Sequence, residues 1–76
     1  MFTVKVIDRK TGRPVKGVKV SVGFDGLFRG FTKDQYTDYD GEVHFDNDNG
    51  TGTIYVKGQR EYEGRIEGRK VIYIDD

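Results

Sequence analysis

The chain contains no cysteine and no tryptophan, and it has a single proline among its 76 residues. Without cysteine, neither a disulfide nor a thiolate metal site can stabilise the fold. Alanine is absent and leucine occurs once, at Leu27, so the residues that favour helices most strongly are nearly missing. No apolar run approaches the roughly 20 residues that a membrane-spanning helix requires. These absences exclude a disulfide framework and argue against a helical domain.

The apolar residues that are present are mostly β-branched or aromatic. Nine valines and five isoleucines are accompanied by five phenylalanines and five tyrosines. Such side chains suit a pleated, half-buried surface, and eleven glycines supply frequent turns. Apolar and polar residues alternate in short segments, most clearly over residues 18–24. The sequence therefore predicts one all-β domain over residues 1–76, a small sandwich of six or seven antiparallel strands without helices.

Turn-forming residues separate the predicted strands. Asp40-Gly41 is a strong tight-turn signal, because glycine tolerates the positive φ that such turns require. Strands are expected near residues 2–6, 18–24, 43–45 and 54–56, with a weaker polar segment at 32–37. Residues 61–74 are expected to form two strands around Glu67-Gly68. Their register stays open, because either Val71 and Tyr73 or Ile72 and Ile74 can face inward.

Three segments of the chain share a pattern of turn and core residues. Residues 11–20 read TGRPVKGVKV, residues 37–45 read TDYDGEVHF, and residues 52–56 read GTIYV. In order and spacing these segments resemble the carboxypeptidase-regulatory-like, or transthyretin-like, domains. The resemblance implies a prealbumin-like or immunoglobulin-like β-sandwich. It also implies a non-catalytic accessory or structural module.

Acidic and basic residues balance overall but are segregated along the sequence. There are thirteen of each, which gives no general attraction to nucleic acid or to an anionic membrane. Residues 1–23 carry a net charge of +5, residues 24–53 carry −5, and residues 54–76 are neutral. Oppositely charged neighbouring strands explain this segregation, and head-to-tail association of two charged surfaces is the alternative. A nucleic-acid partner is not expected, because no recognition motif accompanies the basic segment.

His44 is the only histidine of the chain. It lies between Val43 and Phe45, both expected to face inward, so its side chain should face outward. No nucleophile or acid–base constellation accompanies it. The enzymatic relatives among transthyretin-like proteins use several histidines, which this chain lacks. The chain is therefore not expected to be an enzyme.

Acidic residues gather in the middle of the chain. Closely spaced carboxylates and carbonyls are the ligands that Ca²⁺ prefers, so Asp38, Asp40, Asp46 and Asp48 are candidate calcium ligands. Hydrogen bonds from these side chains to turn backbone explain the same composition without a metal. Both interpretations stay open, and no other cofactor is expected.

Aromatic residues suggest a binding surface. Exposed rings on a β-sheet can anchor a protein partner or stack on a sugar, although rings can also cap the ends of a sandwich. The candidate partner-binding residues are Phe28, Arg29, Tyr36, Tyr39 and Tyr55.

The expected function is a structural or protein-binding role, and a calcium- or carbohydrate-binding accessory domain is the alternative. Self-association through sheet edges is compatible with such a fold. The given residues contain no signal peptide, so a cytoplasmic location without membrane contact is expected if the chain is full length. A domain excised from a longer secreted protein is the alternative.

Overall fold

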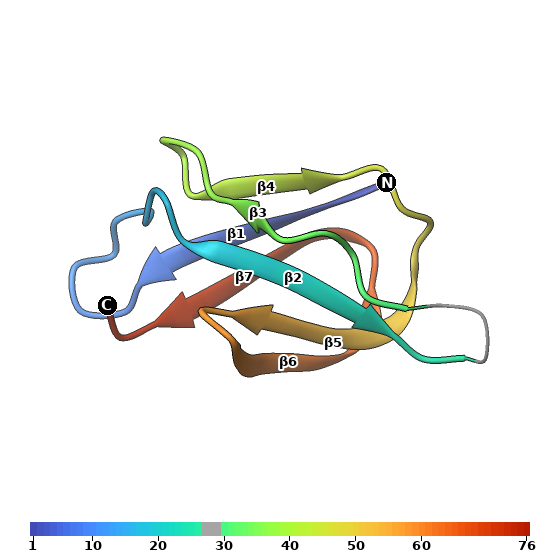
Figure 1. Ribbon diagram of the computed structural model, residues 1–76. Helices are drawn as coiled ribbons and strands as arrows, with labels where there is room; N and C mark the ends of the chain where they lie inside the picture. The colour runs from blue at the N-terminus through green and yellow to red at the C-terminus, as the bar shows by residue number, and fades with distance from the viewer. Residues whose placement is uncertain (27–29) are drawn as a thin grey trace.

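The computed structural model describes residues 1–26 and 30–76, which form two β-sheets packed face to face (Figure 1). The seven strands are β1 (Phe2–Asp8), β2 (Lys19–Phe24), β3 (Gln35–Tyr36), β4 (Glu42–Phe45), β5 (Gly50–Val56), β6 (Gln59–Ile66) and β7 (Gly68–Ile74). These described residues contain no helix, and hence none that could span a membrane. The prediction of a small all-β sandwich is confirmed. The weak polar segment at 32–37 supplies only the two residues of β3.

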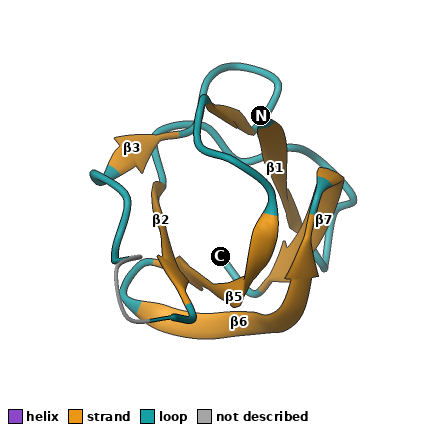
Figure 2. Cartoon of the chain, turned by 90° about the vertical axis from the view of Figure 1, so that its right-hand side faces the viewer, coloured by secondary structure: helices purple, strands orange, loops and turns teal. Residues whose placement is uncertain are grey.

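The two sheets have the strand orders β4-β1-β7 and β3-β2-β5-β6. All pairs are antiparallel except β1 and β7, which run parallel. The parallel pair departs from the fully antiparallel sandwich that was expected. Its cause is the connection between β6 and β7, because the single residue Glu67 carries the chain from one sheet directly into the other (Figure 2). The chain then enters the three-stranded sheet in the same direction as β1.

The last two strands do not pair with each other. β6 pairs with β5, and β7 pairs with β1 from Gly68 opposite Phe2 to Ile74 opposite Asp8. This register buries Ile72 and Ile74, each 5% exposed, and turns Val71 and Tyr73 outward. Of the two registers left open by the sequence, the one with the isoleucines inward is correct.

The core lies between the sheets and consists of alternate strand residues. Its fully buried members include Val4 and Val6 from β1 and Val20 and Val22 from β2. Burial of each such side chain contributes roughly 1.5–3 kcal/mol to stability. Three phenylalanines, Phe2, Phe24 and Phe45, pack against one another at one end of the core. Phe2 stacks on Phe45 with ring centroids 5.0 Å apart and meets Phe24 edge-on at 5.8 Å.

The turn between β3 and β4 is fixed by Thr37 and Gly41. The buried Thr37 hydroxyl accepts a hydrogen bond from the Val18 N–H at 2.9 Å and donates one to the Val15 carbonyl at 2.6 Å. Gly41 has a φ of +73°, and a Cβ there would lie 2.6 Å from the Val6 carbonyl oxygen. Two residues of the TDYDG segment therefore have folding roles, and the predicted turn at Gly41 is confirmed.

Candidate functional site

The outer face of the four-stranded sheet carries three aromatic rings, those of Phe31, Tyr36 and Tyr55, here named the aromatic face. Tyr36 lies opposite Lys19 and Tyr55 lies opposite Ser21 in the strand pairing. Directly opposite residues project from the same face of a sheet, so these rings lie on the side away from the core. Phe31 and Tyr36 are 73% and 65% exposed. The sheet thus presents apolar ring surface to solvent.

The Phe31 ring is held in place by β2. Its residue forms an isolated bridge with Gly23, and its ring centroid lies 5.8 Å from that of Tyr55. A Cβ at Gly23 would lie 2.7 Å from the ring, so the glycine provides the space that the ring occupies. The next residue anchors the segment, because Thr32 donates its N–H to the Val22 carbonyl and accepts the Val22 N–H at its hydroxyl. These contacts therefore fix the position of the Phe31 ring, although most of its surface is exposed.

The predicted partner-binding residues are only partly brought together. Tyr36 and Tyr55 share the aromatic face. Tyr39, which is 81% exposed, lies in the turn between β3 and β4, where the Lys16 ammonium lies 3.4 Å from its ring centroid. Such a cation–π contact at an exposed site contributes about 0.5–1 kcal/mol. Tyr39 is therefore held by its own partner and is not part of the aromatic face.

Two of the predicted residues, Phe28 and Arg29, lie outside the described residues. In contrast, Phe31 lies on the aromatic face but is not among the five candidate partner-binding residues. A signal for it existed, because Gly23 interrupts an otherwise regular alternation of valines and polar residues in β2. A glycine within a strand often marks a close approach of another group.

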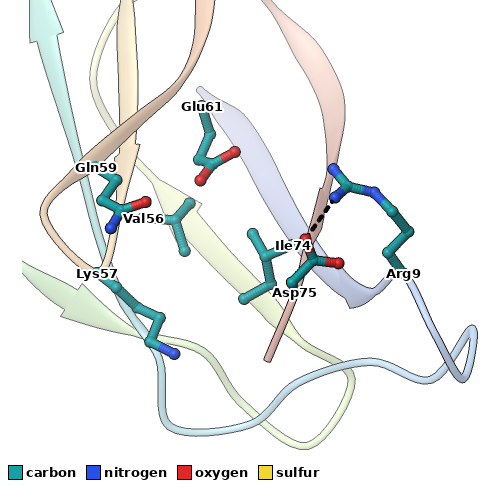
Figure 3. A pocket seen from close by; sticks show the side chains of 7 residues that line it. All are labelled: Arg9, Val56, Lys57, Gln59, Glu61, Ile74 and Asp75. Atoms are coloured by element: carbon teal, nitrogen blue, oxygen red, sulfur yellow. Dashed lines mark hydrogen bonds and ion pairs between the residues drawn. The ribbon is translucent and has the colours of Figure 1, made fainter.

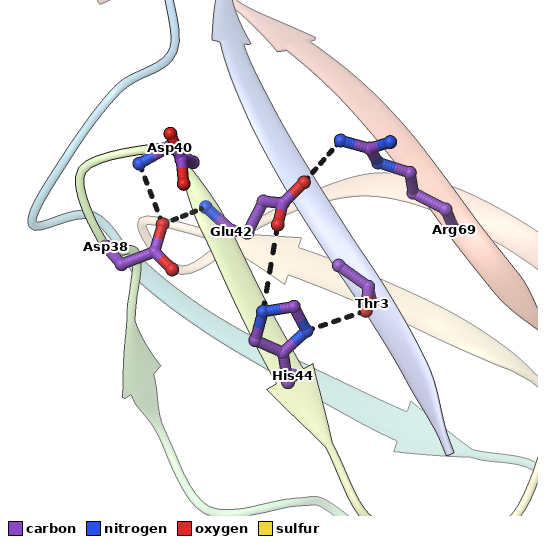
Figure 4. Close-up of polar contacts among 6 residues, drawn as sticks. All are labelled: Thr3, Asp38, Asp40, Glu42, His44 and Arg69. Carbon is purple, nitrogen blue, oxygen red and sulfur yellow. Dashed lines mark hydrogen bonds and ion pairs between the residues drawn. The ribbon is translucent and has the colours of Figure 1, made fainter.

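The outer face of the three-stranded sheet is covered by polar contacts between strands (Figure 4). This polar face consists of Thr3, Glu42, His44 and Arg69. The Thr3 hydroxyl lies 2.8 Å from His44 Nδ1, and Glu42 accepts a hydrogen bond from Arg69. The second Glu42 oxygen lies 3.7 Å from His44 Nε2, beyond hydrogen-bond distance. His44 faces outward as predicted.

On the polar face a hydroxyl, an imidazole and a carboxylate lie next to one another in space, as they do in nucleophilic triads. Triad chemistry needs the carboxylate hydrogen-bonded to the imidazole and a water-excluding site with oxyanion donors. Here the Glu42 carboxylate is engaged by Arg69, and the His44 side chain is 62% exposed on an open sheet face. Thr3 and His44 are a directly opposite cross-strand pair, and Glu42 of β4 meets Arg69 of β7 across the intervening β1.

The candidate calcium ligands fall into two separate pairs. In the turn before β4, Asp38 Oδ1 accepts the N–H groups of Asp40 and Glu42, each at 2.9 Å (Figure 4). These hydrogen bonds, above all that from Glu42, lower the pKa of Asp38 from its ordinary value of 3.8. Asp46 and Asp48 follow the other end of β4. Across residues 1–26 and 30–76, no three acidic or histidine side chains are grouped to hold a metal ion.

A pocket of about 270 Å³ opens at one end of the sandwich, between the start of β6 and the end of β7 (Figure 3). Its residues come from four strand ends and combine an apolar floor with a charged rim. The floor is formed by Val56 and Ile74, and the rim by Arg9, Lys57, Gln59, Glu61 and Asp75. This end pocket was not predicted, because its residues are scattered over the sequence and no motif joins them.

Comparisons of the chain with protein-family models, with curated proteins and with solved structures gave no match. The resemblance to carboxypeptidase-regulatory-like domains therefore stays a prediction from sequence motifs. Function must be inferred from the surfaces described above.

Proposed function

We propose that the domain is a non-catalytic binding module that recognises a protein partner through its aromatic face. The observation that carries this proposal is the Phe31 ring, which is seated over Gly23 and against Tyr55 while 73% of the residue stays exposed. An aromatic side chain that is already positioned loses little conformational freedom on binding. Its burial against a partner removes apolar surface from water at roughly 25 cal/mol per Å².

The shape of the face favours a protein over a small molecule. The rings lie across neighbouring strands of an open sheet, whereas small ligands are usually enclosed by concave sites. A standard protein interface covers about 800 Å² on each partner. The accessible surface of the domain is 4905 Å², so one sheet face supplies an area of that order. Lys19 beside Tyr36 adds a cation at the rim of the face.

The test is to compare Phe31→Ser with the matched control Tyr39→Ser. Both variants remove an exposed ring, but only the first lies on the aromatic face. Proteins captured from the native cell by the wild-type domain are identified by mass spectrometry, and the leading one is purified for calorimetry. A central aromatic anchor is worth at least about 2 kcal/mol, so Phe31→Ser should weaken binding roughly thirtyfold while Tyr39→Ser keeps wild-type affinity.

Equal affinities of the two variants would contradict the proposal. A carbohydrate ligand is the alternative, and the half-buried Ser21, which lies opposite Tyr55, supplies a hydroxyl that is compatible with it. A chemical-shift titration against a panel of glycans distinguishes the two. Saturable chemical-shift changes at Tyr55 and Phe31 with a glycan would show that the aromatic face binds a sugar and not a protein.

A further inference from the structure

The end pocket lies between two strand edges. β6 is the outermost strand of the four-stranded sheet and β7 is the outermost strand of the three-stranded sheet. Glu67 joins the two strands at one end of the molecule, and they separate toward the other end, where the pocket opens (Figures 1 and 3). Among the described residues, no further strand pairs with either edge. Neither edge is therefore covered by a strand, although on the β7 side the Tyr73 carbonyl accepts a hydrogen bond from the Arg9 guanidinium at 3.1 Å.

A β-bulge directs Glu61 into this pocket. Ile54 pairs with Tyr62 and Tyr55 pairs with Arg60, which leaves Glu61 as an extra residue in β6. Bulges bend a strand and can re-aim a side chain. Tyr62 packs against the core, while Glu61 lines the pocket and its carboxylate points into it (Figure 3). The bulge thus places a carboxylate above an apolar floor.

A second irregularity lies in the same hairpin. Lys57 has a φ of +56° and is the one non-glycine residue with positive φ in the part of the chain that the structure describes. With Gly58 it forms the two-residue turn between β5 and β6, where asparagine, aspartate or glycine is usual. Strained positions cluster at functional sites. Here the strained residue contributes to the rim of the pocket that receives Glu61.

The charged residues that line the pocket are two cations, Arg9 and Lys57, and two carboxylates, Glu61 and Asp75. Arg9 is paired with Asp75 at 2.9 Å, and Lys57 is paired with Asp76 at 3.3 Å. Glu61 makes no ion pair with any residue of the described ranges 1–26 and 30–76. Because Lys57 pairs with Asp76, which does not line the pocket, Glu61 is left as a carboxylate without an ion pair over the floor of Val56 and Ile74. The complementary ligand is a cation on an aliphatic stem.

We propose that the end pocket binds a lysine or arginine side chain from an extended segment of a partner protein. The aliphatic stem lies on Val56 and Ile74, and the cationic group meets the Glu61 carboxylate. A volume of about 270 Å³ suits one such side chain. The backbone of the segment adds to the edge of β6 or β7, as in other strand-addition complexes. This site is separate from the aromatic face, so either proposal can fail without the other.

The first measurement uses the wild-type domain and two five-residue peptides with blocked ends. One peptide carries a central lysine, and the other carries norleucine, which lacks only the ammonium group. In a ¹⁵N chemical-shift titration the lysine peptide should shift the amides of Val56, Glu61 and Ile74. Its affinity should exceed that of the norleucine peptide at least about fivefold and fall as salt is added. Equal affinities, or no shifts with the lysine peptide at millimolar concentration, would overturn the proposal.

The second measurement compares Glu61→Gln with Glu63→Gln. Glu63 lies on the same strand, but its carboxylate is 3.6 Å from Arg60 and does not line the pocket. Glu61→Gln should weaken the lysine peptide at least about fivefold and leave the norleucine peptide unchanged, whereas Glu63→Gln should change neither. An equal loss in both variants would also overturn the proposal. The wild-type comparison of the two peptides stands even if a variant folds poorly.

Discussion

The two outer faces of the sandwich are formed by similar strands of alternating polarity, but their outward-facing side chains differ in how many contacts they make. On the polar face, Thr3, Glu42, His44 and Arg69 contact one another across all three strands. On the aromatic face, the ring of Phe31 lies on a neighbouring ring and a glycine and leaves most of its surface exposed.

The difference shows how a sheet face becomes available for binding. Side chains of the polar face supply hydrogen-bond partners for one another, so a binding partner would have to displace existing contacts. Rings on the aromatic face satisfy no polar group and retain apolar area that a partner can cover. The comparison predicts that substitutions under the aromatic face affect stability most, and that substitutions on the polar face affect it little.

The largest effect is expected at Gly52, in the strand that carries Tyr55. A Cβ at Gly52 would overlap the Gly23 carbonyl oxygen and crowd the Phe24 backbone. Gly52→Ala must therefore separate β2 from β5, and it should lower the free energy of unfolding by about 3 kcal/mol or more. Chemical denaturation measures this loss. Gly30→Ala is the control, because no heavy atom of residues 1–26 and 30–76 lies within 4 Å of its added Cβ. Similar midpoints for the two variants would refute the expectation.

The next largest effect is expected at Thr37, which joins the edge of the four-stranded sheet to the segment before β2. Thr37→Val leaves the Val18 N–H and the Val15 carbonyl without their hydroxyl partner. The free energy of unfolding should fall by about 2–4 kcal/mol. Thr37→Ser keeps the hydroxyl and should cost less than about 1 kcal/mol. Thermal or denaturant unfolding of both variants tests this, and equal losses would show that the hydroxyl is not responsible.

A smaller effect is expected on the polar face. Glu42→Gln removes a carboxylate that binds Arg69 and lies near His44, but the Arg69 and His44 side chains are more than half exposed. Ion pairs of this kind contribute about 0.2–1 kcal/mol and weaken as salt rises. Unfolding experiments at low and high salt should give a loss in that range that shrinks with salt. A salt-independent loss of several kcal/mol in the free energy of unfolding would contradict the expectation that substitutions on the polar face affect stability little.

The smallest effect near neutral pH is expected for Asp38→Asn, since asparagine retains an oxygen that accepts the turn N–H groups. The hydrogen bonds lower the pKa of folded Asp38 below the ordinary 3.8 that the unfolded chain keeps. Its ionised carboxylate therefore adds stability above that value and loses the contribution as the pH falls through the folded pKa. The melting temperature of the wild type should exceed that of the variant at about pH 6, and the two should converge as the pH falls below 3.8 and through the folded pKa. A difference that stays constant with pH would contradict this assignment.

Much of the fold could be predicted because one face of each inner strand is buried. Alternation alone placed Val4, Val43 and Phe45 in the core, and the structure confirms all three. Alternation failed for β7, since both of its faces carry large apolar side chains. The decision between its two registers comes from parallel pairing with β1, a contact between distant parts of the chain that no local pattern contains.

The surfaces proposed here for binding were harder to predict from the sequence than the fold. Tyr55 was named as a candidate because the neighbouring Ile54 and Val56 fix the direction in which it points, and Tyr36 because it lies in a polar segment. Phe31 is not among the five candidate partner-binding residues, because its position depends on a bridge to Gly23. Glu61 was missed because a bulge exists only relative to the partner strand. Features that arise from strand pairing can be recognised only when the partner strand and its register are known.

The parallel pairing of β1 with β7 has a consequence for the order of folding events. β1 is the central strand of its sheet, and one of its two neighbours is the last strand of the fold. Ribosomal synthesis releases β1 first, and its second neighbour emerges only after the other five strands. Pairing across such a sequence separation is slow to form, and an uncovered valine-rich edge favours intermolecular association in the meantime. The domain is thus most exposed to aggregation during the interval before β7 arrives.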